Sequence, residues 1–95
     1  MNILLVEDHA VVREGVRKLL ADQFQATVRE AADVETGIRH YEKLRPDVLI
    51  LDLNLEKTGG LEMLRRVLAI DGKANILVFT THSEPVYAAR CMRAG

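Results

Sequence analysis

The sequence has little that would tie it to a membrane, to nucleic acid or to an oxidising compartment. Its single cysteine, Cys91, excludes an internal disulfide. Thirteen Lys and Arg stand against fourteen Asp and Glu, so the formal net charge of −1 gives no sign of a basic surface for nucleic acid or anionic lipid. No apolar run approaches the roughly 18 residues of a spanning helix, and acidic residues appear too early for a signal peptide. We therefore expect a cytoplasmic protein.

The composition is that of one small globular domain. The 95 residues are 48% hydrophobic and 28% charged, which is neither the composition of a disordered chain nor enough length for two domains. No repeat, linker or low-complexity segment interrupts them. We expect a single domain over residues 1–95.

Short apolar runs alternate with amphipathic stretches along the chain. The runs at 3–6, 48–53 and 76–79 predict strands buried on both faces, and a weaker run at 26–31 alternates as an edge strand would. Apolar residues at helical spacing predict helices over about 12–20, 34–44 and 61–70. Asp33 is expected to cap the second of these, a Gly-Gly loop precedes the third, and a last helix is expected from Ser83 to about Ala94. This alternation predicts an α/β fold with a doubly wound parallel sheet.

Three carboxylates come at the ends of predicted strands. Glu7 and Asp8 follow the first strand and Asp52 ends the third. In a flavodoxin-like order, 2-1-3-4-5, these two strands are neighbours, so the carboxylates should meet in one shallow pocket. Packed anions need a cation, and hard oxygen ligands at a wet site favour Mg²⁺. Each acid taken alone is equally well read as a solvated loop residue, but three of them, with the hydroxyl of Thr80 after the fourth strand, favour phosphoryl transfer to a carboxylate.

At this point the sequence resembles the receiver domain of two-component response regulators. The resemblance rests on residues 3–9 (ILLVEDH), 45–53 (RPDVLILDL), 60–62 (GLE) and 76–80 (ILVFT), which keep the family's order and spacing over nearly the whole chain. Residues 8–16 and 82–87 further resemble the subgroup that carries a C-terminal LuxR-type helix-turn-helix.

The resemblance implies a function and a role for each site residue. A histidine kinase would supply the phosphoryl group, and Asp52 looks like its acceptor. Asp8 looks like a direct Mg²⁺ ligand, Glu7 like the acid that holds metal-bound waters, and Asn54 would offer its backbone carbonyl. Thr80 looks like the switch hydroxyl. The parent protein would be a transcription factor with a DNA-binding output domain, and the chain would be a phosphoryl acceptor, not an enzyme with a separate substrate.

The sequence departs from the family pattern in two ways. Glu56 stands where the family usually has proline, four residues past the acceptor. The family's fifth strand, the lysine at its end and its fifth helix are not present in the 95 residues, so we expect the domain to be incomplete at its C-terminus. The run at 76–79 would then be an exposed apolar edge, and we expect a homodimer or an exchange of elements through it.

Three alternatives stay open. The chain can be a non-functional fragment of a receiver, because the lysine is absent. An aspartate-nucleophile phosphohydrolase of the haloacid-dehalogenase type also places an Asp at a strand end, but it needs a longer chain and a second Asp where this one has Asn54. A phosphorylation-independent pseudo-receiver would be expected to lose members of the acidic set, all of which are present.

Overall fold

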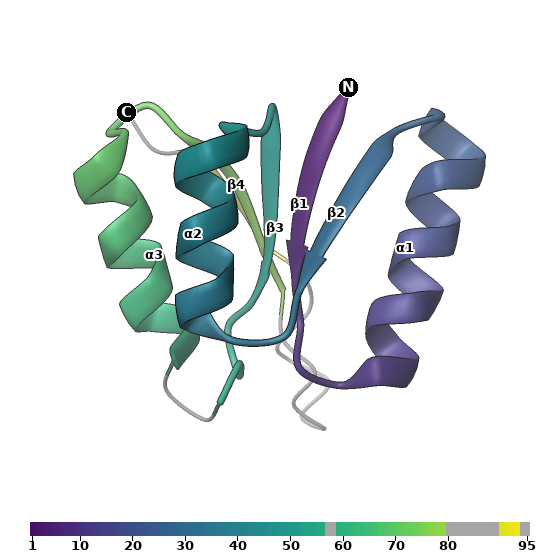
Figure 1. The fold of residues 1–95 in the computed structure, drawn as a ribbon, viewed down its shortest axis with the longest axis horizontal. Coiled ribbons are helices and arrows are strands. Elements are labelled where there is room, and N and C mark those ends of the chain that lie inside the picture. Colours follow the sequence, from purple (N-terminus) through teal and green to yellow (C-terminus); the bar gives the residue numbers. More distant parts are fainter. Residues whose placement is uncertain (57–58, 80–89, 94–95) are drawn as a thin grey trace.

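The computed structural model describes residues 1–56 and 59–79, and the backbone of residues 90–93. Five strands and three helices lie in these ranges (Figure 1). In chain order they are β1 (Asn2–Val6), α1 (Ala10–Phe24), β2 (Thr27–Ala31), α2 (Val34–Leu44), β3 (Val48–Asp52), α3 (Gly59–Ile70), β4 (Asn75–Phe79) and β5 (Arg90–Arg93).

The strands form one sheet in the order β2-β1-β3-β4-β5. The first four are parallel, with Val6 opposite Ala31 on one side and Leu51 on the other, and Asp52 opposite Phe79. The α/β architecture and the order 2-1-3-4 predicted from the sequence are confirmed. Since parallel strands all end at the same edge, the residues after β1 and β3 are brought together there.

The helices cover the two faces of the sheet unequally. Alternate strand residues, such as Leu4 and Leu51, share a buried cluster with residues of α2 and α3. Ile3, Leu5 and Ile50 instead form a cluster with Leu20 of α1. The strands are therefore apolar on both faces, as their continuous hydrophobic runs predicted. None of the helices in the described ranges is both long enough and apolar enough to cross a membrane.

Helix α2 begins and ends as its sequence predicts. The Asp33 side chain accepts a hydrogen bond from the Thr36 N–H at 2.8 Å, which satisfies one of the free donors of the first turn. At the other end Arg45 adopts a left-handed conformation and closes the helix just before Pro46.

Helix α3 begins earlier than predicted. The Gly59–Gly60 pair was expected in the loop, but both glycines belong to the first turn of α3. A Cβ on Gly60 would lie 2.4 Å from the carbonyl oxygen of Leu53 and 2.5 Å from that of Asp52. A residue without a side chain is needed there because the helix starts against the backbone that follows β3.

The prediction of a helix reaching Ala94 is wrong for residues 90–93. They form β5, which pairs antiparallel with β4, with Arg90 opposite Val78 and Arg93 opposite Asn75. Pairing satisfies the N–H and C=O groups that the β4 edge would otherwise leave open. The expectation of an exposed β4 edge is therefore also wrong, and with it the basis for a homodimer through that edge. Ser83, the expected cap, lies outside the described residues.

Candidate metal centre

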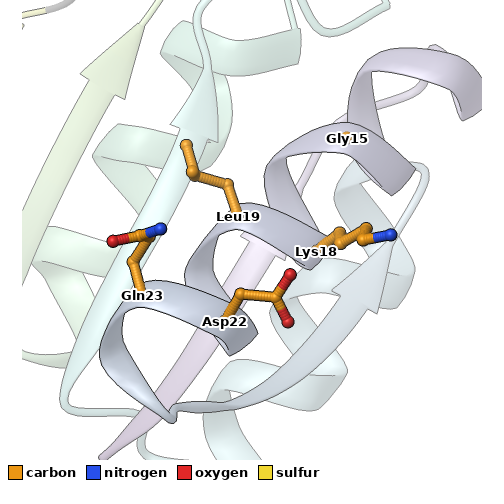
Figure 2. A pocket seen from close by; sticks show the side chains of 5 residues that line it. All are labelled: Gly15, Lys18, Leu19, Asp22 and Gln23. Carbon is orange, nitrogen blue, oxygen red and sulfur yellow. The ribbon is translucent and has the colours of Figure 1, made fainter.

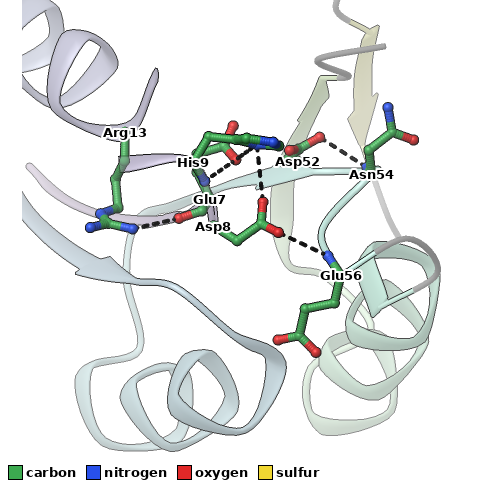
Figure 3. A network of polar contacts seen from close by, with 7 residues as sticks. All are labelled: Glu7, Asp8, His9, Arg13, Asp52, Asn54 and Glu56. Carbon is green, nitrogen blue, oxygen red and sulfur yellow. Dashed lines mark hydrogen bonds and ion pairs between the residues drawn. The ribbon is translucent and has the colours of Figure 1, made fainter. Parts of the chain in front are cut away.

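Four side chains that can ligate a metal converge at the carboxyl edge of the parallel strands (Figure 3). They are Glu7 and Asp8, which follow β1, His9, which precedes α1, and Asp52, the last residue of β3. One ligand atom from each lies within 4.8 Å of those of the others. The three acids singled out in the sequence are brought together because β1 and β3 are adjacent and in register.

The cluster is buried at its base and open at its rim. Glu7 and Asp52 are both 0% exposed, whereas the Asp8 side chain is 32% exposed. The Glu7 N–H still belongs to the sheet, since it donates to the Ala31 carbonyl at 3.0 Å. The pairing of β1 with β2 therefore holds the Glu7 carboxylate in a buried position at the end of the sheet.

The two oxygens of Glu7 have different surroundings. Oε2 accepts from the backbone N–H of His9 at 2.9 Å and lies 3.0 Å from Nδ1 of the same residue. Oε1 is buried and has no hydrogen-bond partner among the described residues. An oxygen in this position needs a donor or a cation, because a buried, unsatisfied charged atom is costly.

The charges of the cluster influence one another. Burial raises the pKa of Glu7, and the neighbouring Asp52 adds to the rise, although hydrogen bonds from His9 oppose it. The hydrogen bond to Glu7 raises the pKa of His9, as does the charge of Asp8, 3.2 Å from the imidazole. Burial alone would raise the pKa of Asp8, but hydrogen bonds, first among them one from the Glu56 N–H, hold it below its ordinary value. The net arrangement attracts positive charge.

The turn after β3 fixes the direction of Asp52. The Asn54 N–H donates to Asp52 Oδ1 at 2.9 Å, and the Leu53 N–H extends the sheet by donating to the Phe79 carbonyl at 2.7 Å. Leu55 donates to the Asp52 carbonyl at 3.1 Å, and its own side chain is fully buried. A buried leucine thus anchors the turn in which the Asn54 N–H orients the carboxylate.

The donor set fits a hard divalent cation. Three carboxylates offer oxygen ligands, one of them from the unpartnered Oε1 of Glu7. Mg²⁺ and related ions take oxygen ligands and retain waters, which suits a site that is open on one side. Asn54 lies two residues from Asp52 in the same turn, and Thr80 lies outside the described residues.

Two contributors to the site were missed in the sequence. Arg13 lies on α1, one turn after His9, and its Nη1 donates to the Glu7 carbonyl at 2.9 Å (Figure 3). Its Nε donates to Glu30 at 3.2 Å. The distance of four residues between His9 and Arg13 was the available signal in the sequence. Glu56, noted only for replacing proline, donates its N–H to Asp8 Oδ2 at 3.3 Å.

A separate hollow of about 270 Å³ lies on the surface of α1 (Figure 2). All the residues that line it come from this one helix: Gly15, Lys18, Leu19, Asp22 and Gln23. It shares no residue with the carboxylate cluster.

Comparisons with known proteins identify the family of the chain. Residues 3–95 match the family described as the response regulator receiver domain. The methanol utilization control regulatory protein MoxX of Paracoccus denitrificans is 33% identical over 97 residues, which cover 100% of this chain and 44% of MoxX. The chain thus spans less than half the length of this curated relative.

Solved structures share the fold. A two-component response regulator of the LuxR family from Aurantimonas sp. SI85-9A1 is 42% identical, with a TM-score of 0.78 over 86% of this chain and 59% of that one. A crystal structure of the histidine kinase ThkA in complex with the response regulator TrrA matches with 24% identity and a TM-score of 0.78, over 88% of this chain and 72% of that one. At that identity the second match supports the fold alone.

Proposed function

Since this chain belongs to the response regulator receiver domain family, we propose that it is a phosphorylation switch in which Asp52 accepts a phosphoryl group from a histidine kinase. The observation that carries the proposal is a buried carboxylate at the end of β3 beside a second buried carboxylate with an unpartnered oxygen. Such a pair is costly in a purely structural role and suits a site that binds a cation and then an anionic phosphoryl group.

The cation in this proposal is Mg²⁺. Asp8, Asp52 and the backbone carbonyl of Asn54 would hold it directly, and Glu7 would hold it through water. When bound, Mg²⁺ neutralises charge on the carboxylates and on the phosphoryl oxygens. The chain's own residues supply the geometry, because Asn54 orients the Asp52 carboxylate and Arg13 holds the backbone at Glu7.

The transfer itself needs a nucleophile and a leaving group. An oxygen of the Asp52 carboxylate attacks phosphorus while the phosphorus–nitrogen bond of the kinase phosphohistidine breaks, and the bonding electrons leave with the imidazole. The product is an acyl phosphate on Asp52 and a free histidine on the kinase. Thr80, which directly follows β4 in the sequence, is proposed to donate its hydroxyl to the new phosphoryl group.

The output of the switch lies in the rest of the parent protein. The chain covers 41% of the transcriptional regulatory protein DegU of Brevibacillus brevis, at 30% identity. We infer a DNA-binding output domain that follows the receiver and responds to its phosphorylation.

The test is phosphorylation by a small-molecule donor. The chain is incubated with acetyl phosphate and Mg²⁺, and its intact mass is compared with that of Asp52→Asn and of a control, Asp22→Asn, on the exposed surface of α1. We expect one added phosphoryl group in the wild type and in the control, and none in Asp52→Asn or after chelation of Mg²⁺.

The outcomes separate three readings. Labelling that persists in Asp52→Asn would overturn the acceptor assignment. No labelling of this chain, but labelling of a version lengthened with the rest of a relative's receiver domain, would mean that the acceptor is correct and the 95 residues are an inactive piece. No labelling in either would refute the proposed function.

A further inference from the structure

Glu56 has an unusual backbone conformation and two contacts that point in different directions. Its φ is 46°, in the left-handed region that few residues other than glycine, asparagine and aspartate adopt. In this conformation its N–H faces Asp8 Oδ2 at 3.3 Å, and its side-chain Oε1 accepts a hydrogen bond from the Val34 N–H at 3.2 Å. A strained residue that is held at both ends is a candidate for a specific role.

The side-chain contact anchors Glu56 on the N-terminus of α2. Val34 is the first residue of that helix, so its N–H has no partner within the helix. Asp33 already caps Thr36, and Glu56 supplies a second acceptor from 22 residues further along the chain. The negative carboxylate also suits the positive end of the helix dipole.

The first turn of α3 also lies close to this helix end. A Cβ on Gly59 would lie 2.9 Å from Cγ2 of Val34 and 3.4 Å from Cβ of Glu56. There is thus little free space between Gly59 and the first turn of α2. Glu56 itself is tied to α2 by the hydrogen bond between its side chain and the Val34 N–H.

The backbone contact orients Asp8. One of its oxygens lies 3.2 Å from His9 Nδ1, and the other accepts from the Glu56 N–H. Both ends of the carboxylate are therefore held before any cation arrives. Groups that hydrogen-bond to a metal-ligating carboxylate set its orientation, and removing them commonly weakens metal binding by 10- to 100-fold.

We propose that Glu56 is a positioning residue for the cation ligand Asp8: its carboxylate, anchored on the first N–H of α2, holds its own backbone N–H against Asp8. The inference rests on the proposed function for the role of Asp8 in binding Mg²⁺. It adds that the N-terminus of α2 and the cation site are mechanically linked through one side chain. Proline at this position has neither the N–H nor the side-chain acceptor, so the link is particular to a chain with Glu56.

The test compares Mg²⁺ binding by the wild type and four variants, measured by titration calorimetry. Glu56→Ala removes the anchor but keeps the backbone N–H, and we expect it to bind Mg²⁺ about tenfold more weakly. Glu56→Gln keeps an oxygen that can accept from Val34, and we expect its dissociation constant to stay within about twofold of the wild type. Glu42→Ala, which removes an exposed carboxylate elsewhere on α2, should bind as the wild type does.

Amide NMR spectra of the metal-free proteins give a readout that does not depend on activity. The Val34 amide signal should move in Glu56→Ala but hardly in Glu56→Gln, because only the first loses its acceptor.

Three results would overturn the positioning role. Equal weakening in Glu56→Ala and Glu56→Gln would mean that only the negative charge matters. Wild-type affinity in Glu56→Ala would mean that the anchor does nothing for Asp8. Wild-type affinity in Glu56→Gly, which deletes the side chain and suits the left-handed backbone, would mean the same. Absence of Mg²⁺ binding in the wild type would instead overturn the proposed function.

Discussion

Replacing Glu7 with glutamine should raise the free energy of unfolding of the metal-free protein. The Glu7 side chain is 0% exposed, and its Oε1 has no hydrogen-bond partner among the described residues. A buried polar atom in this state costs about 1–3 kcal/mol, and more when it is charged. Glutamine keeps an oxygen for His9 and can turn its NH₂ group toward the Asp52 carboxylate. We expect a gain of about 1–3 kcal/mol at pH 7.

The gain should depend on pH with a definite sign. Burial raises the pKa of Glu7 above its ordinary value of 4.5. Below that value the carboxyl group is neutral in both the folded and the unfolded protein, so wild type and Glu7→Gln should differ little. As the pH rises above 4.5, Glu7 ionises more readily in the unfolded chain than in the folded protein. The wild type therefore loses stability until the pH passes the raised pKa of Glu7. The advantage of Glu7→Gln should grow over that interval.

Urea unfolding followed by far-UV circular dichroism measures the difference, since the chain has no tryptophan. With a chelator present, Glu7→Gln should be the more stable protein, while the exposed control Glu42→Gln should match the wild type. With Mg²⁺ at a hundred times its dissociation constant, the wild type should gain about 2.7 kcal/mol and the variant less. A variant less stable than the wild type in chelator at pH 7 would refute the reasoning.

Two further predictions concern Gly60 and His9. Gly60→Ala should lower the free energy of unfolding by about 3 kcal/mol, because its Cβ would lie 2.4 Å from the Leu53 carbonyl oxygen. Gly15→Ala, whose Cβ would meet nothing within 4 Å, should raise the free energy of unfolding by up to about 1 kcal/mol. Denaturant titrations measure both changes. The hydrogen bond to Glu7 raises the pKa of His9, so His9 stabilises the fold below the ordinary imidazole pKa of about 6.5 and loses this effect as pH rises through the raised value. His9→Gln should therefore have a lower melting temperature than the wild type in mild acid and the same melting temperature in mild base. A difference in melting temperature that does not change with pH would contradict this.

Much of the site was predictable because it follows from sheet topology. The runs that end in Glu7, Asp8 and Asp52 are apolar on both faces, so they had to be central parallel strands. Neighbouring parallel strands end at one edge, and the convergence of the three acids needs no knowledge of the loops. The cap at Asp33 was predictable for a similar reason, since it depends only on residues three positions apart.

The parts that could not be predicted depend on distant contacts. Residues 90–93 fall within a segment whose sequence predicts a helix, but they pair with β4. The edge of β4 to which they pair exists only once the sheet has formed. The left-handed Glu56 is held by Asp8 and by Val34, which are 48 and 22 residues away. No local propensity favours glutamate in that conformation, so the sequence gives no signal for it.

The unequal cover on the two faces of the sheet implies that the domain does not open as one unit. Among the described residues, fifteen form the buried cluster under α2 and α3, while only four form the cluster under α1, and Leu20 is the one buried residue of α1 itself. Helix α1 should therefore detach from the native state at a lower free energy than α2, and its amide hydrogens should exchange with solvent sooner. Because Arg13 belongs to α1, each such opening removes the hydrogen bond between its guanidinium and the Glu7 carbonyl.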